Sequence, residues 1–135
     1  MKRAIIDTNV IIDGVRIRPE LDFETAVSSV TYAELHVGVL LARDDDSRAA
    51  RLKVLSAARQ AYGPGLPFDD AAAVNHAQVD AAVRAAGRSS NSRAKDLMIA
   101  ATARAQGAAV VTFNTADFVG LEGIVEVIDA RTVTA

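Results

Sequence analysis

Four acidic residues of this chain stand where carboxylates could act together in chemistry: Asp7, Glu34, Asp96 and Asp117. Two carboxylates about 4 Å apart repel by about 4 kcal/mol at an effective dielectric near 20. If these side chains converge, a cation must lie among them. Carboxylate oxygens are the ligands that Mg²⁺ prefers, and Mn²⁺ is an acceptable substitute. The acids therefore predict a Mg²⁺ site that also accepts Mn²⁺.

The prediction of a metal site rests mainly on Asp7, because its neighbours in sequence are apolar. It lies within the stretch RAIIDTNVII, with only Thr8 and Asn9 between it and the next apolar residues. A buried charge without a partner is costly, so Asp7 needs a partner that the rest of the sequence must supply. The apolar strand that contains Asp7 supplies no lysine or arginine near it.

Each of the other three acids also has a structural interpretation. Thr31 to Glu34 fits a capping box, in which Thr31 is the helix cap and Glu34 bonds back to it. Asp96 could favour the positive end of its helix, and Asp117 could begin a turn. The residues alone leave these alternatives open. The chain has two histidines, His36 and His76, which are not spaced as a ligand pair, and this disfavours zinc.

The elements that must position these acids alternate between strands and helices. Short apolar, β-branched segments predict strands at 3–6, 26–29, 109–112 and 125–128. A turn or helix is expected from about residue 8, and helical spacing predicts helices at 32–42, 45–62, 70–86 and 94–106. This alternation predicts an α/β fold with a mostly parallel sheet covered on both faces. Ligands of such sheets bind at the carboxyl ends of the strands, where Asp7 stands.

The composition limits the number of domains, the cellular location and the ways in which this protein could contact nucleic acid. A chain of 135 residues is expected to form one domain, 1–135. The absence of cysteine excludes disulfides and thiolate metal sites, and no segment fits a secretory signal or membrane span, so a cytoplasmic location is expected.

A net charge of −2 gives no global basic surface. Contact with nucleic acid must then use bound cations or local basic residues, and the candidates are Arg88, Arg93 and Lys95. Solvated loop charge is the alternative role for these three.

The segments DTNV, TYAEL, KDLMIAATA and TFNTADF, in this order along almost the whole chain, resemble a PIN-domain nuclease. They are similar in particular to the ribonuclease toxins of VapBC toxin–antitoxin pairs. The resemblance implies a PIN-like three-layer α/β/α sandwich and a metal-dependent endoribonuclease acting on tRNA or other structured RNA. It assigns metal binding and catalysis to Asp7, Glu34, Asp96 and Asp117, and supporting roles to Asn9, Thr31, Thr112 and Asn114. It also marks a departure, because Phe113 stands where such proteins often have arginine.

The resemblance further implies a homodimer and a cognate VapB-type antitoxin. Val37, Leu40 and Leu41 lie on one predicted helix and exceed what a single core-facing stripe requires. They predict either a groove for a partner or deeper burial within the monomer. A second function remains open, namely a non-catalytic PIN-like module that binds metal and RNA or a protein partner without cleaving. The presence of all four acids favours the nuclease.

Overall fold

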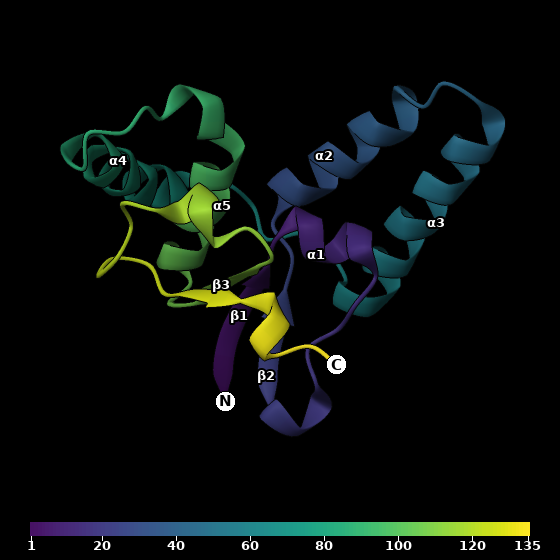
Figure 1. Cartoon of the computed structure of the whole chain (residues 1–135), viewed down its shortest axis with the longest axis horizontal. Coiled ribbons are helices and arrows are strands. Elements are labelled where there is room, and N and C mark those ends of the chain that lie inside the picture. Colours follow the sequence, from purple (N-terminus) through teal and green to yellow (C-terminus); the bar gives the residue numbers. More distant parts are fainter.

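A four-stranded sheet forms the centre of the computed structural model, which describes residues 1–135. Its strands lie in the order β2-β1-β3-β4, and every neighbouring pair is parallel. The strands are β1 (Lys2–Ile6), β2 (Phe23–Ala26), β3 (Ala109–Thr112) and β4 (Val127–Asp129). The helices are α1 (Thr8–Asp13), α2 (Ser29–Leu40), α3 (Asp45–Tyr62), α4 (Asp70–Ala85) and α5 (Ala94–Ala105). Figure 1 shows α4 and α5 on one side of the molecule and the α2–α3 pair on the other.

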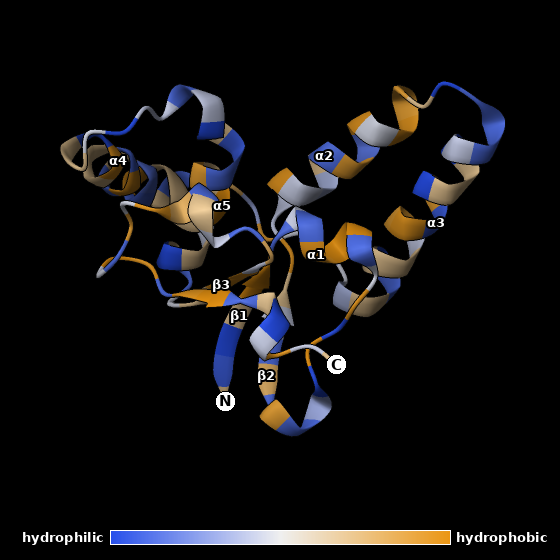
Figure 2. Cartoon of the chain, viewed as in Figure 1, coloured by the Kyte–Doolittle hydropathy of each residue, from blue (hydrophilic) through white to orange (hydrophobic).

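Both faces of the sheet are buried because side chains alternate along each strand. Ile5 and Val110 belong to a core shared with α4 and α5. Ala4, Ile6 and Val111 belong to a second core shared with α1, α2 and α3. The three-layer α/β/α fold predicted from the sequence is therefore confirmed, and the strands coloured hydrophobic at its centre are visible in Figure 2.

The register of the strands brings their carboxyl ends to one edge. Ile6 of β1 pairs with Val111 of β3, and Thr112 of β3 pairs with Asp129 of β4. Asp7 therefore follows β1 at the level where Thr112 closes β3. Residues just after these strands, including those of the short turn Thr115–Phe118, gather at this edge.

The predicted helices at 45–62, 70–86 and 94–106 are confirmed to within one residue, and Asp69 caps α4. The strand expected at 125–128 is shifted to Val127–Asp129, and part of the polar loop before α5 forms a short 3₁₀ turn, Asn91–Arg93. None of the helices combines the length and the apolar character that a bilayer crossing requires.

The entry to α2 corrects two predictions. The strand expected at 26–29 is β2, Phe23–Ala26, and the helix expected at 32–42 begins at Ser29. Ser28 is the helix cap, because its side-chain oxygen accepts a hydrogen bond of 3.0 Å from the backbone N–H of Val30. Thr31 is fully buried inside the first turn, so the capping box with Glu34 was wrong. A serine three residues earlier competes for the same capping role, and sequence spacing alone does not separate the two.

Candidate active site

Asp7 is held in the interior by two hydrogen bonds. It is only 3% exposed, and its Oδ1 accepts from the backbone N–H of Thr8 at 2.8 Å, which caps α1. Its Oδ2 accepts from the hydroxyl of Thr112 at 2.8 Å. Burial raises the pKa of Asp7, these two bonds lower it, and the charges of Glu34 and Asp117 raise it further. The carboxylate is thus oriented, but no cationic side chain of the protein is paired with it.

The Thr112 hydroxyl joins three residues at the end of β3. Besides donating to Asp7, its oxygen accepts from Nδ2 of Asn9 at 3.1 Å and from the backbone N–H of Asn114 at 3.0 Å. The side-chain oxygen of Asn9 in turn accepts from the backbone N–H of Phe113 at 3.1 Å. These bonds fix the chain as it leaves β3, and with it the direction of Asp7.

Glu34 enters the site from α2 through two threonines. The hydroxyl of Thr8 donates to Oε1 of Glu34 at 2.7 Å, so the hydroxyl of Thr31, 2.9 Å away, must donate to Thr8. Thr31 therefore connects α2 to α1 at the site. Its contact with Thr8 replaces the capping role that its position suggested. Thr8 is a residue that sequence reasoning missed, and its place directly after Asp7 was the signal available.

Asp96 shows most clearly that the acids share one electrostatic environment. It lies half-buried in the first turn of α5. Burial, followed by the charges of the other three acids, raises its pKa to about 7, and Arg93 lowers it only in part. A carboxyl group three residues into a helix would otherwise favour its charged form. The charges of Asp7, Asp117 and Glu34 therefore act together on Asp96.

Asp117 is carried by the turn Thr115–Phe118, which two side chains hold in place. Nδ2 of Asn114 donates to its Oδ2 at 2.8 Å. Nη1 of Arg93 donates to the backbone oxygen of Asp117 at 2.6 Å and to that of Val119 at 3.4 Å. Arg93 thus ties this turn to the start of α5. Sequence reasoning offered it as an RNA contact, but its hydrogen bonds are those of a residue that positions Asp117.

A polar hollow of about 660 Å³ opens beside Asp117. Its walls come from the end of α4, the loop after it and the Asp117 turn. The lining residues are Ala86, Gly87, Arg88, Ser89, Ser92, Arg93, Ala116 and Asp117. Arg88 is exposed in this hollow, whereas Lys95 is exposed outside it. Of the three basic candidates, Arg88 is the one that is exposed in the hollow beside Asp117.

The donor set fits a hydrated divalent ion. All four groups are carboxylates, and neither His36, exposed on α2, nor His76, packed edge-on against Phe68, joins them. No group of three acidic or histidine side chains is close enough to enclose an ion by itself. Mg²⁺ commonly uses one or two carboxylates and keeps several waters, so the all-carboxylate donor set is of the kind that it binds.

An apolar surface extends from the site along α1 and α2. Val37, Leu40 and Leu41 are 45%, 78% and 70% exposed, and Ile12 of α1 is 60% exposed. The alternative of deeper burial within the monomer was therefore wrong. The free end of α2 is coloured hydrophobic in Figure 2. A hollow of about 380 Å³ between α1, α2 and α3 includes Ile12 and Glu34 in its lining, so the surface adjoins Glu34 at Ile12.

Comparisons with known proteins agree with this arrangement. The family model of the PIN domain matches residues 4–119. Ribonuclease VapC5 of Mycobacterium tuberculosis is 37% identical over 128 residues, which is 92% of this chain and 91% of the relative. The crystal structure of VapBC-5, a member of the VapBC family of toxin–antitoxin systems from the same organism, superposes with a TM-score of 0.79 at 36% identity, covering 95% of this chain and 98% of that one. FitAcB from Neisseria gonorrhoeae gives a TM-score of 0.77 at 26% identity, covering 96% and 99%. This chain belongs to the PIN-domain family and, within it, to the VapC-type proteins.

Proposed function

We propose that this protein is a metal-dependent endoribonuclease that acts as the toxin of a toxin–antitoxin pair, with residues 1–135 working as one domain. The observation that carries the proposal is the shared environment of Asp7, Glu34, Asp96 and Asp117 at one edge of the sheet. A scaffold has no structural need for four mutually repelling carboxylates. The names of the relatives, ribonucleases VapC5 and VapC4, support the same activity.

The four carboxylates are proposed to hold Mg²⁺, with Mn²⁺ as a substitute. When bound, such an ion would activate water and neutralise charge that develops on a phosphodiester. The hydrogen bonds of Thr112 and Thr8 keep Asp7 and Glu34 oriented as oxygen ligands. The side chains of Asn9 and Thr31 and the backbone N–H of Asn114 hold those donors in place. Asn114 and Arg93 fix the turn that presents Asp117.

RNA is the proposed substrate, and Arg88 is the proposed contact to its backbone beside the acids. Without a cation the acidic edge repels phosphate, so binding of RNA and binding of metal are expected to support each other. Lys95, exposed in the first turn of α5, is a second candidate for the RNA backbone.

A VapB-type antitoxin is the proposed protein partner, and the relatives include structures named as VapBC systems. The exposed apolar residues of α2, with Ile12, offer the surface for an apolar segment of such a partner. Because that surface adjoins Glu34, a bound segment would also restrict access to the acids. We further propose that the protein is a homodimer, which its molecular mass in solution will test.

The direct test is cleavage of total tRNA and of a structured RNA by the purified protein without antitoxin. Reactions contain Mg²⁺, Mn²⁺ or EDTA, and the variants are Asp7→Asn and Asp46→Asn. Asp46 is exposed in the first turn of α3 and matches the change in charge at a distance from the edge. We expect cleavage with either metal, none with EDTA, and loss of activity only in Asp7→Asn.

Metal binding without cleavage of any RNA would contradict the nuclease and favour a non-catalytic module. Equal activity of Asp7→Asn and Asp46→Asn would contradict the assignment of the site. Thermal melting of both variants checks that neither loses activity by unfolding.

A further inference from the structure

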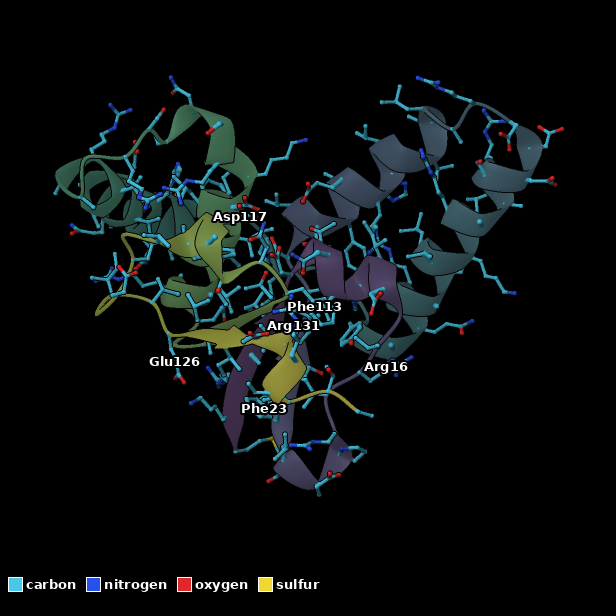
Figure 3. All side chains as sticks on the ribbon, in the orientation of Figure 1. Arg16, Phe23, Phe113, Asp117, Glu126 and Arg131 are labelled. Carbon is cyan, nitrogen blue, oxygen red and sulfur yellow. The ribbon has the colours of Figure 1, made fainter.

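A second basic group stands at the carboxyl edge of the sheet, beside the outer strand β4. Asp129 ends β4 in register with Thr112, and the short turn Ala130–Thr132 follows directly. Arg131, in that turn, lies at the same edge as the acids but on the outer strand. Figure 3 shows Arg131 next to Phe113, the residue that follows Thr112.

Phe113 and Asp129 together hold the guanidinium of Arg131. The carbon at its centre lies 5.8 Å from the centroid of the Phe113 ring, within the range of a cation–π contact. Nη1 donates to Oδ1 and Oδ2 of Asp129 at 3.3 and 3.2 Å. Phe113 itself is anchored, because its backbone N–H donates to Asn9 and its ring packs against the core under α1 and α2.

The guanidinium is nevertheless available to a ligand. The Arg131 side chain remains 68% exposed, and both bonds to Asp129 use the same nitrogen. Arginine has five N–H donors in a planar fork that matches the oxygens of a phosphate. An exposed pair between neighbouring residues adds little stability, so fold stability alone does not explain this arrangement.

We infer that Arg131, supported by Phe113, binds a phosphate of the RNA on the β4 side of the acidic edge, and this inference rests on the proposed ribonuclease function. A strand of RNA that crosses the edge would then contact Arg88 in the hollow beside Asp117 and Arg131 beside β4. Arg131 is an RNA-binding residue here, and it takes no part in the chemistry at the scissile bond.

Arg131→Gln tests the inference, with Arg3→Gln as its matched control. Arg3 is 57% exposed and pairs with Glu24 at 3.6 Å, but it lies at the amino end of β1, the opposite edge of the sheet. For Arg131→Gln we expect KM for RNA to rise about tenfold, as for loss of one charge-assisted contact, with kcat unchanged. The slope of log affinity against log salt should fall by about 1. Arg131→Lys should restore part of the affinity, and Phe113→Leu should weaken binding less than Arg131→Gln.

Equal KM and equal salt slope for Arg131→Gln, Arg3→Gln and the parent protein would overturn the inference. A fall in kcat with unchanged KM would also overturn it, since that places Arg131 in the chemistry. To separate this from failure of the proposed function, RNA binding is also measured in the Asp96→Asn background, with and without Arg131→Gln. Binding weakened by Arg131→Gln in that background supports the RNA contact even if no cleavage is found.

Discussion

The hydroxyl of Thr112 donates a hydrogen bond of 2.8 Å to Oδ2 of Asp7 and so joins the end of β3 to the end of β1. Both residues are buried, and the bond lowers the pKa of Asp7 against the opposing effect of burial. The same hydroxyl oxygen accepts from Asn9 and from the backbone of Asn114. One side chain therefore fixes the direction of the most buried acid and favours its charged form.

Replacing Thr112 with valine removes the hydroxyl while keeping its shape. Asp7 loses a donor, and two donors lose their acceptor inside the protein, so we expect the free energy of unfolding to fall by about 1–3 kcal/mol. Mn²⁺ affinity should fall about ten- to a hundredfold, as when groups that orient metal ligands are removed. Denaturant unfolding and Mn²⁺ titration measure the two effects. Thr112→Ser keeps the hydroxyl and is the control, and a loss in Thr112→Ser as large as that in Thr112→Val would contradict the assignment of the effect to the hydroxyl.

Replacing Asp96 with asparagine separates activity from stability. The variant should lose cleavage by at least about a hundredfold if Asp96 is a metal ligand. Without metal it should melt at a higher temperature than the parent protein at pH 8, because burial and three neighbouring charges oppose ionisation of Asp96. A cleavage assay and thermal melting in EDTA provide the measurements. A lower melting temperature at pH 8 would show instead that the charged form of Asp96 stabilises the fold.

Stability without metal should depend on pH in a defined direction. The pKa of Asp96 is about 7 in the folded protein against 3.8 as its ordinary value, so between these pH values the folded state binds more protons than the unfolded state. Its stabilising contribution is complete below the lower value and is lost as pH rises through about 7. The melting temperature in EDTA should therefore fall from pH 5 to pH 8.

Asp96→Asn is the control for this pH dependence, since it removes the titrating group and should flatten the curve. Mg²⁺ or Mn²⁺ should raise the melting temperature more at pH 8 than at pH 5, because metal competes with the proton for the carboxylate. Parallel curves for Asp96→Asn and the parent protein would assign the pH dependence to other groups.

The local sequence patterns of individual strands and helices predicted most of the fold. The buried strand before Asp7 and the apolar helix after Lys95 follow from local periodicity, and the structure has both. The entry to α2 was misplaced because Ser28 and Thr31 are both acceptable caps, and only the packing of Thr31 against Thr8 decides between them. Such a contact joins residues 23 positions apart and leaves no local pattern.

The candidate site also combines residues that the sequence predicts with residues whose roles depend on contacts across the fold. The four acids were chosen from their types and positions, and the structure places them in one electrostatic environment. The roles of Thr8 and Arg93 depend on bonds across the fold, to Glu34 and to the Asp117 turn. Sequence spacing predicts which groups are present at the edge, whereas hydrogen-bond direction decides which of them bind a ligand and which hold their neighbours.

Arg93 has two candidate roles, holding the Asp117 turn or contacting RNA, and the two have different consequences for metal binding. If it holds the Asp117 turn through the backbone oxygens of Asp117 and Val119, Arg93→Ala should weaken Mn²⁺ binding about tenfold even without RNA. If it only contacts RNA, Mn²⁺ affinity should not change. Arg88→Ala is the matched control, since Arg88 lines the same hollow and no hydrogen bond ties it to the turn. Calorimetric titration with Mn²⁺ of both variants distinguishes the roles, and we expect a loss of metal affinity for Arg93→Ala alone.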